Sequence, residues 1–141
     1  MVQLIVGRKG KGKTKYLLEK ANTAVKTAEG HIVYIDKSNQ HMFELDRKVR
    51  LIDASRYPLK NGDEFIGFIC GIAAQDYDLE QIYLDSFIYN SKVADDSAMI
   101  KDYIGQLKAI SELCKVDFIL SVSKDKEELD PDLYDDIIIS L

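Results

Sequence analysis

Two hydrophobic patterns alternate along the chain: short apolar runs, and longer stretches whose apolar residues recur at helical spacing. The short runs predict β-strands at residues 2–6, 31–36, 49–54, 81–87, 117–123 and 136–140. The helical spacing predicts α-helices over residues 13–30, 63–75 and 97–115, the first of them closed by Gly30. Because strands and helices alternate, the pattern favours an α/β fold, a β-α-β unit extended to five or six strands.

Three segments between these elements lack a clear pattern. Residues 37–48 are polar and consistent with one or two helical turns, residues 86–96 are irregular, and residues 124–136 form a charged turn. No internal repeat or linker rich in Ser and Gly interrupts the chain. At this length we expect residues 1–141 to form a single domain.

The composition is that of an ordinary water-soluble protein, with 46% hydrophobic and 30% charged residues. No apolar run reaches the roughly 18 residues that a membrane span needs, so we expect no membrane association. Nothing near residues 2–6 marks the chain for export, which makes the cytoplasm the expected location. Cys70 and Cys114 lie in apolar helical patterns, and we expect both to be reduced, buried thiols.

Charge is distributed unevenly along the chain. Residues 1–70 carry 13 Lys and Arg against 8 Asp and Glu, whereas residues 71–141 carry 6 against 16. Cations are most concentrated in one short stretch, at Arg8, Lys9, Lys11, Lys13 and Lys15. Such crowding suits a compact polyphosphate better than a nucleic acid, so nucleic acid is not an expected partner.

That stretch, "GRKGKGKT" at residues 7–14, matches the pattern G-x-x-x-x-G-K-[ST]. Glycines allow the backbone to wrap closely around a phosphate, and a following helix adds the positive end of its dipole. Lys13 would reach the β- and γ-phosphates, and the Thr14 hydroxyl would coordinate Mg²⁺. The expected nucleotide-binding residues are Gly7, Arg8, Lys9, Gly10, Lys11, Gly12, Lys13, Thr14 and Lys15.

An acidic residue at the end of a neighbouring strand would complete a magnesium site. "IYLD" places Asp85 directly after three apolar residues, at the carboxyl end of a predicted strand. Ligands of open α/β sheets lie at that end, so we expect Asp85 to hold Mg²⁺ through water. The alternative is that Asp85 only caps a helix or a loop.

With these motifs, residues 1 to about 125 resemble the P-loop NTPase superfamily, and within it the RecA-like branch. "GRKGKGKT" looks like its Walker A motif, "GHIVYID" like its second strand ending at Asp36, and "IYLDS" like its Walker B strand. "DFILSVS" is similar to the strand that this branch inserts beside the P-loop strand, with Ser121 and Ser123 where the family places a γ-phosphate sensor.

The resemblance implies a three-layer fold with a mainly parallel sheet and helices on both faces. In this fold residues 2–6 form the central strand, flanked by 117–123 and 136–140, with 81–85 beyond. The whole chain is also similar to short, uncharacterised bacterial ATP-binding proteins that sometimes carry the label of a twitching-motility ATPase. Pilus-retraction motors have acidic and histidine boxes, whereas this chain has only His31 and His41.

The chain departs from the RecA-like pattern at the catalytic glutamate. The two positions where the family carries it read Ser86, and Lys37 and Ser38. Glu44 or Asp46 could reach the site from the polar segment. Ser123 and Lys124 are further candidates for a catalytic contact. We therefore predict Mg²⁺-dependent binding of ATP or GTP, with slow or partner-dependent hydrolysis.

Three functions remain open from the sequence. In the first, a nucleotide-dependent switch, phosphate contacts order residues 37–48 and 86–96 for a protein partner or a second copy; Phe87, Tyr89 and Asn90 are candidate partner contacts. The second is a small-molecule kinase acting on nucleosides or nucleotides. It would need cations on a lid, but the last arginine is Arg56, leaving Lys124 and Lys126. The acidic second half argues against the third, a nucleic-acid motor.

Overall fold

The computed structural model describes residues 1–141 and contains one six-stranded sheet in which every pair of neighbouring strands is parallel. The strands are β1 (Val2–Val6), β2 (His31–Asp36), β3 (Val49–Asp53), β4 (Leu79–Leu84), β5 (Asp117–Val122) and β6 (Ile137–Ser140). Their order across the sheet is β3-β2-β4-β5-β1-β6. The predicted α/β fold is therefore confirmed, with six strands.

The neighbours predicted for β1 are also confirmed. Leu4 of β1 lies beside Leu120 of β5 and Ile137 of β6, and β4 lies beyond β5. The prediction that β1 is the central strand is wrong, because β2 and β3 extend the sheet beyond β4 and leave β1 next to the edge. The centre of the sheet is formed by β4 and β5.

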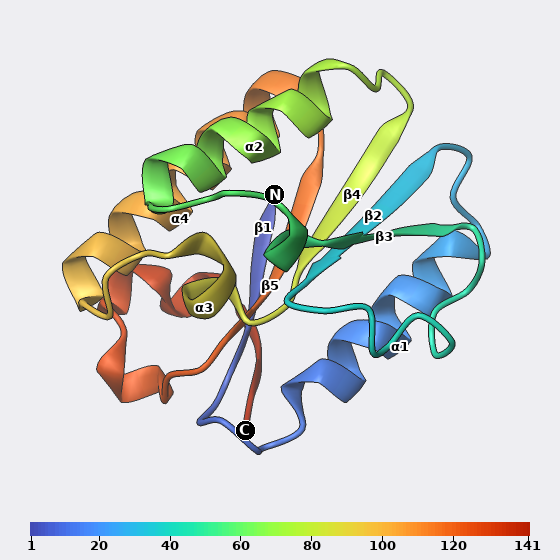
Figure 1. Cartoon of the computed structure of the whole chain (residues 1–141). Coiled ribbons are helices and arrows are strands. Elements are labelled where there is room, and N and C mark those ends of the chain that lie inside the picture. The colour runs from blue at the N-terminus through green and yellow to red at the C-terminus, as the bar shows by residue number, and fades with distance from the viewer.

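Helices cover both faces of the sheet, as predicted (Figure 1). They are α1 (Lys13–Val25), α2 (Gly62–Ala74), α3 (Phe87–Ser91) and α4 (Ser97–Cys114). Alternate strand residues divide between two cores: Leu4 and Val6 pack on the side of α2, α3 and α4, whereas Ile5 packs against α1. No helix combines the length and apolar composition that a membrane crossing requires.

Local hydrogen bonds explain where the predicted helices begin. The Asp96 side chain accepts hydrogen bonds from the backbone N–H groups of Ala98 and Met99, and so caps α4. The Asn61 side chain caps α2 in the same way through the N–H of Glu64. With these caps, α4 begins at its predicted residue and α2 begins one residue before its predicted start.

Two predictions about helical residues are wrong. Helix α1 ends at Val25, and Gly30 is not its cap but lies in the turn before β2. A Cβ atom at Gly30 would come 1.9 Å from the backbone oxygen of Asp78, so close backbone packing requires this glycine.

Cys70 is exposed rather than buried, because it lies on the outer side of α2, and Cys114 is half-buried.

The remaining segments run between the elements as turns and short 3₁₀ helices. Residues 37–48 contain no helix, and the predicted irregular segment 86–96 contains the short helix α3. The 3₁₀ helices are Ala54–Arg56, Lys126–Glu128 and Pro131–Asp136. Residues 37–48 leave the carboxyl end of β2 and residues 86–96 that of β4, so both border the same edge of the sheet (Figure 1).

Candidate functional site

The loop of residues 7–12, called here the glycine loop, joins β1 to the first turn of α1. Gly10 and Gly12 both have φ of +88°, a backbone conformation that residues with a Cβ rarely adopt. Open space surrounds both glycines, so the conformation and not crowding requires them. A loop of this shape before a helix N-terminus can hold an anion.

Lys13, the first residue of α1, turns back into the glycine loop. Its Nζ donates a hydrogen bond to the backbone oxygen of Arg8 at 3.0 Å, and the residue is only 7% exposed. Burial lowers the pKa of Lys13, while the nearby charge of Asp85 opposes that shift. A buried ammonium with one carbonyl partner and no carboxylate in ion-pair contact is suited to receive an anionic ligand.

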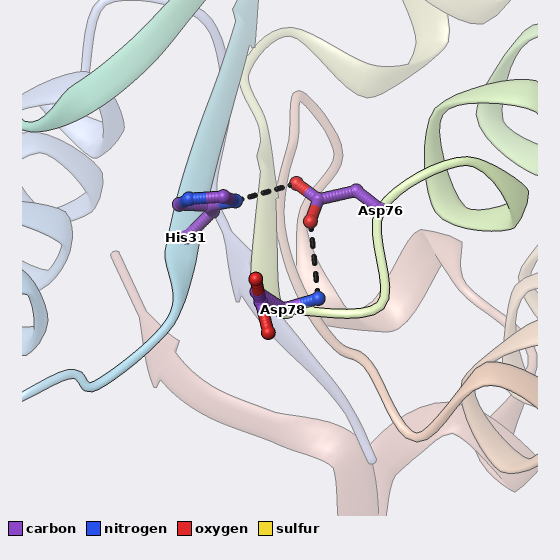
Figure 2. A group of neighbouring side chains, drawn as sticks. All are labelled: His31, Asp76 and Asp78. Atoms are coloured by element: carbon purple, nitrogen blue, oxygen red, sulfur yellow. Dashed lines mark hydrogen bonds and ion pairs between the residues drawn. The ribbon is translucent and has the colours of Figure 1, made fainter.

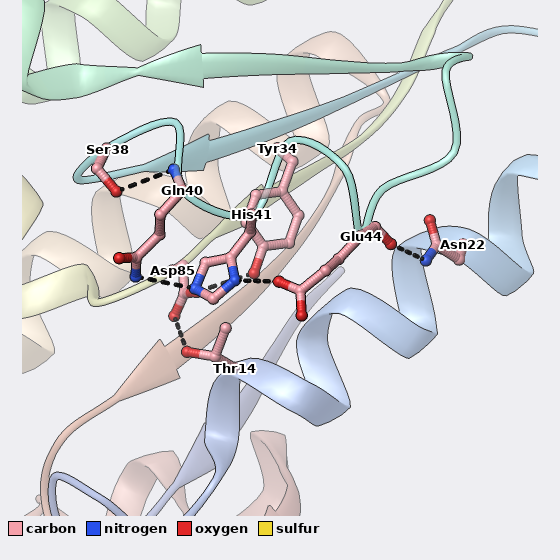
Figure 3. Close-up of polar contacts among 8 residues, drawn as sticks. All are labelled: Thr14, Asn22, Tyr34, Ser38, Gln40, His41, Glu44 and Asp85. Carbon is pink, nitrogen blue, oxygen red and sulfur yellow. Dashed lines mark hydrogen bonds and ion pairs between the residues drawn. The ribbon is translucent and has the colours of Figure 1, made fainter.

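Asp85 directly follows β4 and is 2% exposed. Its Oδ1 accepts hydrogen bonds from the hydroxyls of Thr14 at 3.3 Å and Ser121 at 2.6 Å, and from the N–H of Ser86 at 2.9 Å. Its Oδ2 accepts a hydrogen bond from the Tyr34 hydroxyl at 2.9 Å. The carboxylate therefore joins β4 to α1, β5 and β2, and Figure 3 shows Thr14 and Tyr34 converging on it.

Tyr34 keeps its proton as a donor to Asp85. Burial, together with the charge of Asp85 and the hydrogen bond to it, raises the pKa of Tyr34 well above its ordinary range. The Tyr34 ring also stacks on that of Tyr83, with centroids 6.1 Å apart. Burial, and then the charge of Asp117, raises the pKa of Tyr83 to about 12.

The alternative role for Asp85, a helix or loop cap, does not account for these contacts. Helix α3 begins after Ser86, whose side chain makes no capping bond. The Asp85 side chain makes one backbone contact, with Ser86, and three contacts with side chains of distant elements. Its main-chain oxygen accepts a hydrogen bond from Asn90 Nδ2 at 2.7 Å.

The oxygen atoms around Asp85 fit a magnesium ion. Thr14 donates its hydroxyl proton to Asp85, which leaves the lone pairs of the Thr14 oxygen free for a cation. Magnesium prefers oxygen ligands and keeps several of its water molecules. Since Oδ1 of Asp85 already accepts three hydrogen bonds, contact through a water molecule suits this carboxylate better than direct coordination.

A cavity of about 580 Å³ opens above these groups. It brings together eight of the site residues expected from the sequence: Lys9, Gly10, Gly12, Lys13, Thr14, Asp85, Ser121 and Ser123. Five further residues line it: Lys37, Ser86, Ile88, Tyr89 and Asp95. The site thus lies at the carboxyl ends of β4 and β5, beside the glycine loop.

Four predicted binding residues do not line the cavity: Gly7, Arg8, Lys11 and Lys15. Arg8 points elsewhere, since its Nε bonds Asp125 Oδ2 at 2.6 Å. Lys124, a candidate catalytic residue, also lies outside the lining; its Nζ pairs with Asp95 at 2.5 Å and with Glu128 at 3.7 Å.

Neither candidate acid from residues 37–48 lines the cavity. The side chain of Asn22 on α1 donates a hydrogen bond to the backbone oxygen of Glu44 and accepts one from the N–H of Asp46, both at 2.8 Å. The Glu44 carboxylate pairs with His41 (Figure 3). Asp46 borders a separate hollow beside β3.

Two further polar residues near the cavity come from β2: Tyr34, which had no clear signal in the sequence, and Asp36, which the sequence placed at the end of that strand. Tyr34 looks like an ordinary core residue of a buried strand, and only the pairing of β2 with β4 places it against Asp85. Asp36, at the end of β2, is 2% exposed; its Oδ1 accepts the N–H of Lys37, and its Oδ2 has no partner. Burial raises the pKa of Asp36.

The three candidate partner contacts after β4 differ in exposure. Phe87 and Asn90 are buried, so their prediction as partner contacts is wrong: Phe87 packs in the core and Asn90 bonds the main chain of Asp85. Tyr89 is 61% exposed and lines the cavity. The ammonium groups of Lys37 and Lys92 lie 5.7 Å and 4.7 Å from the centre of its ring.

A second polar cluster lies at the amino ends of the strands, opposite the cavity. His31 Nδ1 and Asp76 Oδ2 are 2.7 Å apart, and the N–H of Asp78 bonds the other oxygen of Asp76 (Figure 2). Arg50 approaches Asp76 at 3.8 Å. Both oxygens of Asp76 therefore have protein partners, and the cluster joins the starts of β2 and β4.

Among solved structures, the crystal structure of the flagellar accessory protein FlaH from Methanocaldococcus jannaschii matches with a TM-score of 0.60 and 17% sequence identity. The match covers 95% of this chain, which spans 65% of the FlaH chain. No protein-family model matches, and neither does any curated protein. The chain therefore shares with FlaH an α/β fold, here with a six-stranded parallel sheet and helices on both faces.

Proposed function

We propose that the protein is a RecA-like P-loop protein that binds Mg²⁺ and a purine nucleoside triphosphate. ATP is the first candidate for this nucleotide and GTP the second. The observation that carries the proposal is the hydrogen-bonded group of Asp85, Thr14 and Ser121 beside the glycine loop. Residues 7–14 would act as the Walker A motif and Asp85 as the Walker B acid. The likeness of fold to FlaH supports nucleotide binding only in general terms.

In this proposal the glycine loop surrounds the phosphates and Lys13 contacts the β- and γ-phosphates. Thr14 would coordinate Mg²⁺ directly, and Asp85 would hold it through water. The ion would neutralise charge on the phosphate oxygens. Lys9, exposed at the rim of the cavity, would add to the attraction of a polyanion.

Hydrolysis would be slow in the isolated protein, because no carboxylate that lines the cavity is free to activate a water molecule. The two acids lining the cavity are Asp85, which has four hydrogen-bond donors, and Asp95, which pairs with Lys124. Ser123 also lines the cavity, but a hydroxyl is a poor base near neutral pH. A partner or a second copy would then supply the missing group.

Such a protein would work as a switch. The segments that leave β2 and β4, residues 37–48 and 86–96, both border the cavity through Lys37 and Tyr89. Nucleotide contacts would order these segments, and a partner would detect the change. FlaH is described as a flagellar accessory protein, and an accessory role beside other proteins fits such a switch.

A small-molecule kinase is the alternative, and the cavity gives it less support. Phosphoryl transfer to an acceptor needs several cations around the transferred group. No arginine lines the cavity, and Lys124, which does not line it either, is paired with Asp95 and Glu128.

A single-turnover experiment with γ-labelled ATP, Mg²⁺ and excess protein tests the proposal, run with and without a cell extract. We expect nucleotide retained on the purified protein, with phosphate release measurable over minutes and faster in the presence of a partner. Transfer of label to a small molecule would instead support the kinase. Lack of nucleotide retention in every arm would contradict nucleotide binding.

A further inference from the structure

Lys37 lines the cavity, but the proposed phosphate and Mg²⁺ contacts do not involve it. It follows β2, its side chain is exposed, and it lines the cavity together with Lys9 and Lys13. The family pattern places a glutamate in this region of the chain, but here the side chain is a cation. Its chemistry therefore suits an anionic ligand and not the activation of water.

No carboxylate forms an ion pair with the Lys37 ammonium. The ion pairs of the chain do not include it, and its backbone N–H, not its side chain, bonds Asp36. Lys124, by comparison, is held by Asp95 and Glu128. Lys37 thus has an unpaired positive charge at the cavity wall.

The strand order places Lys37 on the wall opposite the glycine loop. The loop follows β1, Asp85 follows β4, and Lys37 follows β2, which lies on the far side of β4 from β5 and β1. A triphosphate held by the loop and by Mg²⁺ near Asp85 would extend its terminal phosphate toward this wall. The phosphate closest to Lys37 would be the γ-phosphate.

The only aromatic contact of Lys37 is weak. Its Nζ lies 5.7 Å from the centre of the Tyr89 ring, close to the outer limit for a cation–π contact. Lys92 lies nearer to the same ring, at 4.7 Å, and does not line the cavity. A phosphate would therefore attract Lys37 more strongly than the ring does. Tyr89 would retain its cation–π contact with Lys92.

We propose that Lys37 binds the terminal phosphate of the bound nucleoside triphosphate and so makes the protein discriminate a triphosphate from a diphosphate. Movement of Lys37 away from Tyr89 would couple the γ-phosphate to the segments after β2 and β4. This inference rests on the proposed nucleotide site, and extends it by naming the residue that recognises the phosphate state.

The test is calorimetric titration of three proteins, wild type, Lys37→Gln and Lys92→Gln, each with Mg²⁺ and either ADP or a non-hydrolysable ATP analogue. Lys92 is the matched control, because it contacts the same ring but lies outside the cavity. We expect Lys37→Gln to weaken binding of the triphosphate about 10- to 100-fold, the usual effect of losing one charged contact, and to change ADP affinity less than about twofold. Lys92→Gln should leave both affinities near those of the wild type.

An unchanged ratio of triphosphate to ADP affinity in Lys37→Gln would overturn the inference, while wild-type binding would still support the nucleotide site. Wild-type protein that binds neither ligand would contradict both. Lys37→Ala provides a second variant, and thermal unfolding of each protein verifies that the exposed position tolerates the change. An equal fall in affinity for both nucleotides, in a folded variant, would show only a general charge effect and would also overturn the inference.

Discussion

Buried carboxylates need hydrogen-bond donors, and Asp85 has four of them: three side-chain hydroxyls and one backbone N–H. The hydroxyls come from Thr14, Tyr34 and Ser121, which lie on three different elements. Each donor restricts where the carboxylate can point, so its position is set before any ligand arrives. Preorganisation of this kind reduces the cost of binding a metal and its water molecules.

Lys13→Ala tests the phosphate contact at the level of one side chain. We expect ATP affinity, measured by calorimetry with Mg²⁺, to fall about 10- to 100-fold, because one charged contact to phosphate is lost. The free energy of unfolding should change by about 1 kcal/mol or less, since only the bond to Arg8 is removed. Lys26→Ala, at the exposed far end of α1, is the control and should bind as the wild type does. Equal affinities for the wild type and Lys13→Ala would contradict the assignment of the glycine loop as the phosphate-binding site.

Asp85→Asn tests the proposed magnesium contact. The amide removes the negative charge but keeps an oxygen that can accept the hydrogen bonds of Thr14 and Ser121. ATP affinity should fall about tenfold or more with Mg²⁺ present, and far less when EDTA is present. If Asp85 were only a cap, the two affinities would change together, and isothermal titration in both buffers distinguishes these results.

At the level of elements, the sequence predicts most of the fold because each strand is short, apolar and followed by a helix or a turn. The errors arise where tertiary contacts decide. Gly30 looks like a helix end, but the approach of Asp78 requires it. The start of β4 at Leu79, rather than at residue 81, follows from its pairing with His31, which no local pattern reveals.

The residues of the candidate site also differ in whether the sequence predicts them. Residues 7–14 and Asp85 carry local signals, a glycine pattern and an acid at a strand end. Among the other donors to Asp85, Ser121 matches the family's sensor position, whereas Tyr34 has no local signal. Both reach Asp85 only because β2 and β5 flank β4 in the sheet. Glu44 shows the reverse, since its charge suggests catalysis but Asn22 and His41 hold it outside the cavity.

The contact between His31 and Asp76 predicts a pH dependence of stability. Burial alone would raise the pKa of Asp76, but the hydrogen bonds from His31 and Asp78, with the charges of His31 and Arg50, hold it below its usual value. The ionised carboxylate therefore stabilises the fold above the unfolded-state pKa of about 4, and this stabilisation is lost as the pH falls through the lower folded-state pKa.

Chemical denaturation of Asp76→Asn at several pH values checks this expectation. The variant should be less stable than the wild type at about pH 6, and the difference should shrink as the pH falls through the lowered folded-state pKa of Asp76, because the protonated carboxyl is then neutral like the amide of the variant. Asp78→Asn is the control, because Asp78 contributes its backbone N–H and not its carboxylate. A difference that stays constant over the whole range would show that the charge of Asp76 is unimportant.

At the scale of the whole molecule, the all-parallel sheet brings the glycine loop, Asp85 and Lys37 to one edge, because the carboxyl ends of parallel strands meet there (Figure 1). The elements that would bind phosphate come from strands β1, β4 and β2, and the segments that would respond to it leave β2 and β4. In the proposed function, the same edge would therefore combine nucleotide binding with a means of signalling. Neither acid that lines the cavity at this edge is free to activate water for hydrolysis.

We therefore expect the purified protein to turn over ATP far more slowly than the median enzyme's rate of about 10 s⁻¹. A missing general base costs about 10²- to 10⁴-fold, whereas Lys13 and Mg²⁺ would still stabilise charge on the phosphates, so events should take minutes. A steady-state phosphate-release assay measures the rate, with Lys13→Ala as the background control. Turnover above about 1 s⁻¹ without a partner would mean that an acid reaches the terminal phosphate after all. Glu44→Gln and Asp46→Asn would then identify it, since Glu44 would have to leave His41, and Asp46 its hollow beside β3.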